Sequence, residues 1–421
     1  MNDPLVILDA VRTPFCRAGS ALADLDAVEL GRTAVSALLT KTGIDPQLVD
    51  EVILGCVGQP PQAQNVARVI ALRAGLPQRT PAFTVHRNCA SGLEALTTAH
   101  ARLAAHQGEV FIVGGVESMS QMPLFFRQQA ALKFGNLAKS RSSGQRLQAM
   151  AAFRPADFAP IVGLQVGLTD PVSDLNMGQT AEILAREFGI SREMQDAFAM
   201  RSHLRAVAAP PLPGELIPIY VNGKPVIADN GIRPDSSLEK LAQLKPLFER
   251  QHGSVTAGNS SQITDGAVAL LVASESAAAR LGLTPLARLV DYTAVGCDPA
   301  RMGLGPVHAI DKLLHRTHLT LDDFDVIEIN EAFAAQVLAV MKCLADPASA
   351  RRCGLELPLG EIDPAKLNPR GGAIALGHPV GASGARLVQS AILSLHANQT
   401  KRALVSLCVG GGQGVAAILE T

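Results

Sequence analysis

The stretch Leu38-Leu-Thr-Lys-Thr-Gly-Ile-Asp-Pro-Gln-Leu-Val-Asp-Glu-Val-Ile53 decides the fold, because its pattern occurs a second time near the other end of the chain. The second copy, Leu313-Leu-His-Arg-Thr-His-Leu-Thr-Leu-Asp-Asp-Phe-Asp-Val-Ile-Glu328, aligns with the first without a gap. Two leucines, a threonine and an aspartate coincide, and each copy has the pattern of a helix, a turn and a strand. Chance likeness of two amphipathic helices is the alternative, but the shared turn and aspartate favour duplication of a half-domain.

Short apolar runs alternate with amphipathic stretches on either side of the first copy. The pattern predicts strands at residues 5–8, 52–54, 82–85 and 110–113, and helices at residues 27–41, 65–75 and 91–106. Such alternation is typical of an α/β fold whose sheet is buried between layers of helices. From about residue 118 to residue 252 the alternation stops, which indicates an insertion, and it resumes in a second half from about residue 287.

Composition narrows the classes of protein to which the chain can belong. Its 421 residues are 48% hydrophobic, enough for a large core in two domains or two fused halves. A net charge of -1 provides no basic field for nucleic acid or an anionic membrane. The 7 cysteines are odd in number and form no CxxC pair, so we expect neither a disulfide framework nor a zinc site. This favours a reducing compartment, and without a leader-like segment we expect a cytoplasmic protein.

Cys89 stands in His86-Arg-Asn-Cys-Ala-Ser-Gly92, between a predicted strand and a helix that we expect to begin near Ser91. A thiol at a helix N-terminus faces the positive end of the backbone dipole, so we expect the pKa of Cys89 to fall. The small residues that follow leave room for a bulky substrate. A buried, inert cysteine is the alternative, and it is the better interpretation of any single cysteine considered alone.

Two glycine-rich motifs near the C-terminus carry an imidazole and a second thiol. His378 lies in Leu376-Gly-His-Pro-Val-Gly381, where an imidazole is suited to deprotonate Cys89 near neutral pH. Cys408 ends an apolar run and opens Cys408-Val-Gly-Gly-Gly-Gln-Gly414, whose backbone N–H groups are free to bind an oxyanion. No lysine follows these glycines as a phosphate-binding loop requires. A loop histidine and a core cysteine are the alternatives, and only the combination of all three residues outweighs them.

Two further segments offer polar groups. Asn330 follows the apolar residues 326–329, where its amide could hold a water molecule or donate to a carbonyl group, and a helix cap is the alternative. The small residues 255–261, Val-Thr-Ala-Gly-Asn-Ser-Ser, could lie flat against a long, thin ligand. A tight loop is the alternative there, and composition does not separate the two.

Seven motifs in this order resemble those of the thiolase family (acetyl-CoA C-acyltransferases). They occupy residues 88–93, 114–120, 176–182, 255–261, 330–333, 368–384 and 408–414. Each motif alone is weak evidence for the family, but the seven motifs together cover nearly the whole chain. The resemblance implies two similar βαβαβ halves in α-β-α-β-α layers. The halves would occupy residues 1–285 and 286–421, with a loop domain inserted at residues 119–249.

The resemblance also implies roles for the residues of the motifs. Cys89 would carry the acyl group, His378 would activate Cys89, and Cys408 would be the acid and base at the acetyl α-carbon. A water molecule on Asn330 would form one oxyanion hole together with His378. The backbone N–H groups of Cys89 and Gly410 would form the other.

Arg233, Ala257 and Ser261 fall where the family contacts coenzyme A, which would be a co-substrate; no permanently bound cofactor and no metal is expected. Residues 124–160 and 229–261 resemble the β subunit of the trifunctional enzyme of fatty-acid oxidation. This implies thiolytic cleavage of 3-ketoacyl-CoA in fatty-acid β-oxidation. A homodimer or homotetramer is implied, and a multifunctional α subunit with hydratase and dehydrogenase activity stays open.

Three alternatives to this activity remain. One is an acetyl-CoA C-acetyltransferase acting on acetoacetyl-CoA, and another is a non-catalytic subunit that binds acyl-CoA. A third is a ketoacyl synthase or hydroxymethylglutaryl-CoA synthase, but those need Cys-His-His or Cys-Glu-His sets, against which Cys408 argues. Residues 122–150 mix apolar and basic side chains and could dock a membrane or an α subunit. We favour instead a helix that covers the acyl pocket or the dimer interface.

Overall fold

The computed structural model describes residues 3–421, so the first two residues of the predicted N-terminal half lie outside the described part. Its centre is one large sheet in the order β12-β13-β14-β11-β1-β10-β5-β3-β4, with the short β2 (Cys16–Arg17) beside β10. In chain order the strands are β1 (Leu5–Arg12), β3 (Glu51–Gly55), β4 (Ala82–Val85), β5 (Val110–Ser118), β10 (Thr264–Ser274), β11 (Ala287–Gly296), β12 (Val326–Ile329), β13 (Arg402–Val409) and β14 (Gln413–Glu420).

The strand order is symmetric about the contact between β1 and β11. On one side β1-β10-β5-β3 follow, and on the other side β11-β14-β13-β12, each with two antiparallel pairings and then a parallel one. Val6 and Ile7 of β1 pair with Arg288 and Ala287 of β11, which joins the two sides into one sheet. Among the strands of residues 3–421 in this order, β4 at the outer edge has no counterpart. The structure thus repeats one half-fold, as the repeat in the sequence predicts.

The residues shared by the two sequence copies make the same local contacts. The first copy begins in the last turn of α1 (Ala27–Thr42), and the second copy begins in the last turn of α11 (Gly305–Thr317). The hydroxyl of the shared threonine donates to the carbonyl four residues earlier, at 2.8 Å in α1 and 2.9 Å in α11. Each helix ends at a residue in the left-handed region, Gly43 with φ 65° and His318 with φ 55°.

The shared aspartates fasten corresponding strands together. Asp50 accepts two backbone N–H groups at the start of β5, at 2.7 and 2.9 Å. Asp325 accepts two at the start of β13, at 2.9 and 3.0 Å. Each aspartate therefore ties the strand that it precedes, β3 or β12, to that strand's parallel neighbour.

Helices form three layers around the sheet. In the N-terminal half, α1 and α2 (Val66–Arg73) pack on the outer face. In the C-terminal half, α11 and α12 (Ala334–Ala345) do so. Between the halves lie α3 (Ser91–Ala104) and α15 (Val380–Asn398), whose buried residues share one hydrophobic cluster with strands of both halves. The predicted α-β-α-β-α layering is confirmed. No helix within residues 3–421 is long and apolar enough to cross a membrane.

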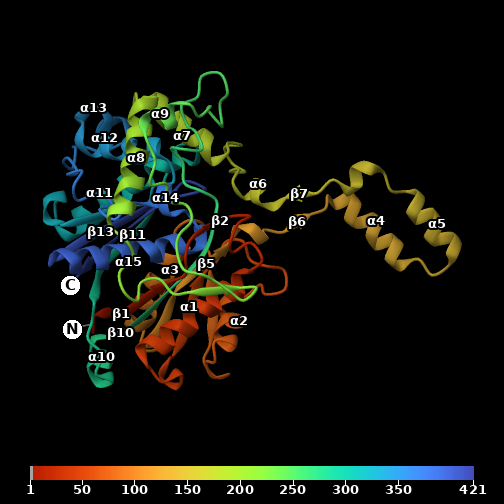
Figure 1. Cartoon of the computed structure of the whole chain (residues 1–421), viewed down its shortest axis with the longest axis horizontal. Helices are drawn as coiled ribbons and strands as arrows, with labels where there is room; N and C mark the ends of the chain where they lie inside the picture. The colour runs from red at the N-terminus through yellow and green to blue at the C-terminus, as the bar shows by residue number, and fades with distance from the viewer. Residues whose placement is uncertain (1–2) are drawn as a thin grey trace.

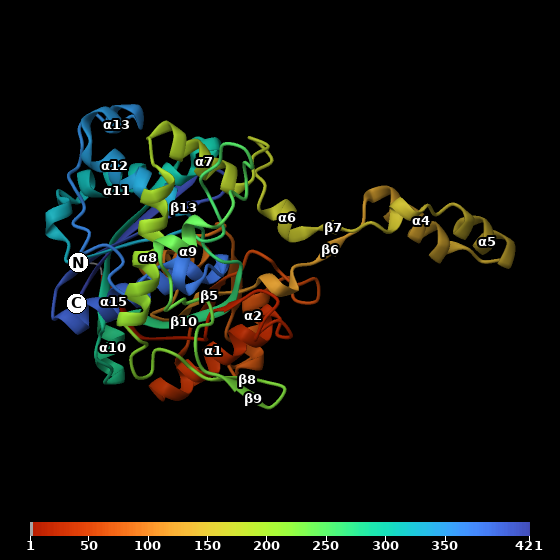
Figure 2. The ribbon, with the colours of Figure 1, turned by 45° about the horizontal axis from the view of Figure 1, so that its top comes forward.

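Part of the insertion extends away from the body as an arm (Figures 1 and 2). At its base β6 (Leu124–Phe125) pairs with β7 (Ile161–Val162), and beyond them lie α4 (Gln128–Lys139) and α5 (Ser143–Ala151). Four phenylalanines of the arm contact one another, two of which, Phe126 and Phe158, remain exposed: Phe126, Phe134, Phe153 and Phe158. The expectation of a helix over the acyl pocket is wrong for α4 and α5, because neither helix lines the pocket at Cys89; cover of a dimer interface stays a prediction.

In the described part of the chain a single disulfide joins Cys343 of α12 to Cys353 at the end of α13 (Pro347–Arg352), a pair that the expectation of no disulfide framework did not foresee. Asp346 caps α13 by accepting the N–H of Ser349 at 2.8 Å, and the chain reverses there. The reversal brings the two cysteines, 10 residues apart, to a Cα–Cα distance of 6.5 Å. A spacing across two helices has no short motif, so sequence inspection missed the pair.

Candidate active site

The beginnings of the two central helices carry the predicted nucleophile and base. Cys89 lies two residues before the start of α3, and His378 lies two residues before the start of α15. The helices approach closely, since a Cβ at Gly92 would lie 2.8 Å from the backbone N of Ala385 and 3.0 Å from the carbonyl O of Gly381. Glycine is therefore required at this crossing, which places both helix starts at the same end of the central layer.

Cys89 is half-buried, and the environment of its sulfur differs from the sequence-based expectation. Burial raises the pKa of the Cys89 thiol above its ordinary value, and the negative charge of Glu117 adds to this. The backbone N–H groups of Gly410 and of Cys89 itself lower this pKa, but only in part. The expected fall in the pKa is thus wrong, because desolvation outweighs the field of the helix N-terminus.

Cys408 lies beside Cys89 across the boundary of the two halves. Its side chain is buried at the end of β13, and burial raises the pKa of the Cys408 thiol well above its ordinary value. The neighbouring thiols of Cys89 and Cys297 raise this pKa further. Gly410 follows in the loop to β14, and its carbonyl accepts the side-chain N–H of Asn88 at 2.7 Å. The structure therefore brings Cys89, Cys408 and Gly410 together.

The His378 ring is fixed in one tautomer. Its Nδ1 lies 2.6 Å from the Ser383 hydroxyl, which itself donates to the Pro379 carbonyl at 2.9 Å. Ser383 must therefore accept from Nδ1–H, and the lone pair of Nε2 is left to act as an acceptor. Burial, together with the positive charge of Arg386, lowers the pKa of His378 to about 3. The imidazole is neutral and retains a basic nitrogen.

Asn330 faces that nitrogen. Its Nδ2 lies 3.5 Å from Nε2 of His378, and its fully buried Oδ1 has no partner within residues 3–421. Asn330 does not cap α12, whose N-cap is Phe333, so the alternative of a helix cap is excluded. In the same described part, no hydrogen bond joins Cys89 to His378, and no group of three or more His, Cys, Asp or Glu side chains could hold a metal ion.

A pocket of about 820 Å³ leads to Cys89, Asn88 and Gly410. Its far wall comes from the base of the arm and from α6 (Gly163–Gly167). Most of its lining is apolar: Met119, Met122, Phe125, Leu164, Val166, Leu168, Val172, Met177 and Val380. A concave site of this size, apolar with a few polar groups at one end, is suited to an apolar chain attached to a reactive group.

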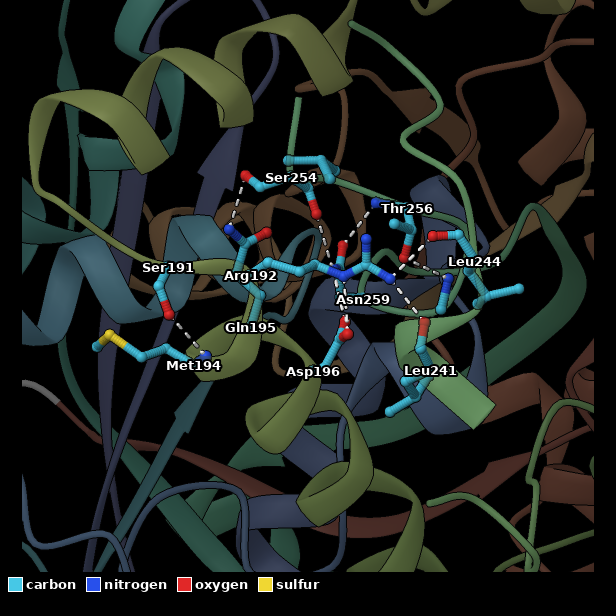
Figure 3. A network of polar contacts seen from close by, with 12 residues as sticks. Ser191, Arg192, Met194, Gln195, Asp196, Leu241, Leu244, Ser254, Thr256 and Asn259 are labelled. Carbon is cyan, nitrogen blue, oxygen red and sulfur yellow. Dashed lines mark hydrogen bonds and ion pairs between the residues drawn. The ribbon is translucent and has the colours of Figure 1, made fainter. Parts of the chain in front are cut away.

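The small-residue segment 255–261 is held against α8 (Arg192–Ala208) by a polar network (Figure 3). Asn259 donates to Asp196 at 3.0 Å and accepts the N–H of Thr256 at 2.8 Å. Arg192 binds the other oxygen of Asp196 at 2.7 Å and donates to the carbonyls of Leu241 and Leu244. The network therefore fixes the backbone of the segment, most of which is buried.

The three residues predicted to contact coenzyme A remain accessible. Ala257 is exposed, and Arg233 and Ser261 are half-buried. The backbone N–H of Arg233 donates to Nδ1 of His203 at 3.2 Å, and that of Ser261 donates to the Ala332 carbonyl at 2.9 Å. Within residues 3–421 none of the three lines the pocket at Cys89, so they do not share that surface with the predicted nucleophile.

Sequence analysis assigned no role to Glu117. This buried carboxylate accepts three backbone N–H groups at 2.7, 2.9 and 3.1 Å, one of them from Gly381 in the first turn of α15. Burial raises the pKa of Glu117 to about 7, and its charge acts on Cys89. The signal that could have identified it is a lone acidic residue in the otherwise small and apolar strand β5.

Comparison with known proteins agrees with this geometry. Residues 5–276 match the family described as Thiolase, N-terminal domain, and residues 283–421 match Thiolase, C-terminal domain. A probable acetyl-CoA acyltransferase of Staphylococcus epidermidis is 42% identical over 425 residues, which cover 99% of this chain and 98% of that protein. One from Staphylococcus aureus is 40% identical with the same coverage.

Two solved structures share the whole fold. The crystal structure of Bacillus anthracis acetyl-CoA acetyltransferase has a TM-score of 0.86 and 37% identity, and the match covers 100% of both chains. That of human mitochondrial 3-ketoacyl-CoA thiolase in complex with CoA has a TM-score of 0.85 and 38% identity, covering 100% of this chain and 98% of that one. The chain is an acyltransferase, and it belongs to the thiolase family.

Proposed function

We propose that this acyltransferase is a 3-ketoacyl-CoA thiolase, which uses coenzyme A to cleave 3-ketoacyl-CoA into acetyl-CoA and a shortened acyl-CoA. The observation that carries the proposal is the apolar pocket of about 820 Å³ at Cys89. Acetoacetyl-CoA offers only a methyl group to such a pocket, whereas a longer acyl chain gains free energy by burial there. An acetyl-CoA C-acetyltransferase is the second candidate, because the Bacillus anthracis protein bears that name.

In the first half-reaction, Cys89 attacks the 3-keto carbon. A thiol with a raised pKa and an imidazole with a pKa of about 3 are both neutral at rest, so His378 Nε2 takes the thiol proton as the sulfur attacks. The N–H groups of Cys89 and Gly410 stabilise the resulting oxyanion. The C2–C3 bond then breaks, and its electron pair becomes the acetyl-CoA enolate. His378 and a water molecule on Asn330 stabilise the enolate oxygen, and the Cys408 thiol protonates C2.

In the second half-reaction, coenzyme A releases the acyl group. Its thiol gives a proton to the Cys408 thiolate and attacks the acyl carbon on Cys89. Collapse expels the Cys89 thiolate, which takes back the proton from His378. A covalent intermediate between two products predicts ping-pong kinetics. Arg233, Ala257 and Ser261 are proposed to hold coenzyme A, because all three side chains are accessible.

Thiolysis of acetoacetyl-CoA and of a long-chain 3-ketoacyl-CoA, measured side by side with coenzyme A, tests the substrate class. Preference for the long chain is expected. Activity confined to acetoacetyl-CoA would make the protein an acetyl-CoA C-acetyltransferase. Activity on neither substrate would favour a subunit that only binds acyl-CoA.

We also propose a homodimer in which β4 pairs across the two-fold axis. This edge strand ends four residues before Cys89, and its outer side has no strand partner within residues 3–421. An open edge invites pairing with another chain, and here it would bury the outer wall of the nucleophile's turn. Light scattering should give twice the 44.1 kDa of one chain. A monomer would rule this out.

The arm supports a docking role, which we propose is contact with an anionic lipid surface. It exposes Leu132, Leu147 and Met150. Its single acidic residue, Asp157, is outnumbered by six basic ones: Arg127, Lys133, Lys139, Arg141, Arg146 and Arg154. Exposed apolar side chains among cations bind anionic lipid. Sedimentation with phosphatidylglycerol vesicles should exceed that with phosphatidylcholine vesicles, and Leu147→Asp should abolish it. Equal, weak sedimentation with both would leave the arm to a protein partner.

A further inference from the structure

Asn88, the residue before Cys89, combines an uncommon backbone conformation with a contact between the two halves. Its φ of 42° lies in the left-handed region, which asparagine tolerates better than most residues. Its carbonyl accepts the N–H of Ser91 at 3.0 Å and the hydroxyl of Ser91 at 2.7 Å, which closes the turn onto α3. The side chain is not used within this turn, and its Nδ2 donates to the carbonyl of Gly410 at 2.7 Å.

Gly410 lies in a loop with little conformational restraint of its own. The next two residues are glycines with φ of 86° and 78°, so the backbone there can adopt many conformations. Within the described chain, two hydrogen bonds from outside the β13–β14 hairpin reach the backbone of this loop. Cys297 donates to the carbonyl of Gly412 at 2.8 Å, and Asn88 donates to the carbonyl of Gly410 at 2.7 Å. Arg87 binds only the side chain of Gln413, the first residue of β14.

Consecutive residues therefore hold Gly410 from both sides. The N–H of Gly410 lowers the pKa of the Cys89 thiol, and the amide of Asn88 binds the Gly410 carbonyl at 2.7 Å. A Cβ at Gly410 would lie 3.9 Å from Asn88 Nδ2 and 3.3 Å from Met177 Sδ, so the amide runs along the loop at contact distance. The N–H of Gly410 belongs to one peptide group and the carbonyl to the next, so only the φ and ψ of Gly410 lie between the bound carbonyl and the N–H.

We propose that Asn88 is a positioning residue, whose amide fixes Gly410 so that the Gly410 N–H stays directed at the Cys89 sulfur and at the oxygen of an acyl group on it. Only the statement about the acyl oxygen depends on the proposed function. The effect on the Cys89 sulfur can be measured in the free protein, without any substrate. A donor held in place stabilises developing negative charge because it need not reorient during the reaction.

Two substitutions separate the hydrogen bond from the backbone conformation. Asn88→Gly keeps the left-handed conformation and removes the amide, whereas Asn88→Asp keeps the size and turns a carboxylate toward the Gly410 carbonyl. The readout is the rate of Cys89 alkylation by iodoacetamide against pH, with the site located by mass spectrometry. We expect the pH midpoint of Cys89 alkylation to rise by about 0.5–1 pH unit in Asn88→Gly, and by more in Asn88→Asp. With 3-ketoacyl-CoA, kcat should fall about tenfold with KM within about twofold.

Asn222→Gly is the matched control. Asn222 also has a positive φ, 50°, but lies exposed in the hairpin between β8 (Ile219–Val221) and β9 (Lys224–Val226), far along the chain from Cys89. This variant should alkylate and turn over as the wild type does. A wild-type midpoint and kcat in Asn88→Gly would overturn the proposal and leave Asn88 as a turn-former. A shifted midpoint in a protein without thiolysis would refute the proposed function and uphold the role of Asn88.

Discussion

In the N-terminal half, Asp9 follows a register shift between β1 and β10 and pairs with Lys41 of α1 at 2.6 Å. In the C-terminal half, Asp291 follows the corresponding shift between β11 and β14 and pairs with Arg316 of α11 at 2.7 Å. Each aspartate also accepts the N–H of the residue after it, at 2.7 and 2.8 Å. The two halves repeat one scaffold down to a bulge and its ion pair.

The halves differ in the side chains at corresponding functional positions. Two residues before its central helix, one half has the thiol of Cys89 and the other has the imidazole of His378. Counting from Val110 and Arg402, whose N–H groups the shared aspartates bind, the buried Val116 of β5 corresponds to Cys408 of β13. The halves therefore share one backbone scaffold, and the candidate site depends on different side chains at equivalent positions of that scaffold.

The largest effect is expected where the halves differ most. Cys89→Ala should lower turnover by about 10⁴-fold or more, because no other group can carry the acyl chain. Cys408→Ala should still form an acyl-enzyme from a saturated acyl-CoA, because a thiolate can leave without being protonated, whereas cleavage of 3-ketoacyl-CoA, which needs a proton at C2, is lost. Intact mass detects the acyl-enzyme. Val116→Ala is the matched control at the equivalent strand position. It should cost about 1–3 kcal/mol of stability but little activity. Equal loss of acylation in Cys408→Ala would contradict its assigned role.

A second prediction concerns Glu117, which corresponds to the apolar Val409 of the other half. Burial raises the pKa of Glu117 from 4.5 to about 7, helped by the charge of Asp265, so its folded form holds a proton longer than its unfolded form. The protonated Glu117 side chain contributes its full share of the unfolding free energy below pH 4.5, and this contribution is lost as pH rises through about 7. The unfolding free energy of the wild type should therefore fall relative to Glu117→Gln by about 3 kcal/mol across this range.

The same substitution should move Cys89 alkylation to lower pH, because a negative charge near the thiol is removed. The wild-type rate should keep rising above neutrality, since the thiol pKa is raised and the neutral His378 forms no ion pair with it. A plateau between pH 5 and 8 would show a stable thiolate and contradict this electrostatic account.

The sequence predicts the features that local patterns encode, and it does not predict those that depend on contacts between distant segments. The repeat, the layered fold and the segments carrying Cys89, His378 and Cys408 were predictable, because periodicity and local motifs encode them. The pKa of Cys89 was not, since burial is set by strands and helices distant in sequence. Ser383 was missed as the partner of His378, because it lies within a run of small helix residues. The direction of the arm leaves no periodic signal at all.

A third prediction compares Asp50 and Asp325, which do the same work in the two halves. Replacing either by alanine removes two hydrogen bonds to backbone N–H groups and should cost about 1–3 kcal/mol. Urea unfolding of the two variants should give losses within about 0.5 kcal/mol of each other. These bonds lower the pKa of Asp325. The free energy of unfolding that Asp325 contributes is therefore present above the ordinary pKa of an aspartate and is lost as pH falls. A cost confined to one aspartate would show that the halves are equivalent in geometry but not in energy.

The smallest effect is expected from the repeated ion pairs. Arg316 binds both oxygens of Asp291, at 2.7 and 2.8 Å, whereas Lys41 binds one oxygen of Asp9. Double-mutant cycles should give about 0.5–1 kcal/mol for the arginine pair and less for the lysine pair, because both are partly exposed. Lys41→Arg should narrow the gap, and 1 M salt should reduce both. Coupling of several kcal/mol in either pair would mean that the charges fix the bulge. Weak coupling means that the bulge places the charges, so that the backbone pattern alone was duplicated and the pairs followed from it.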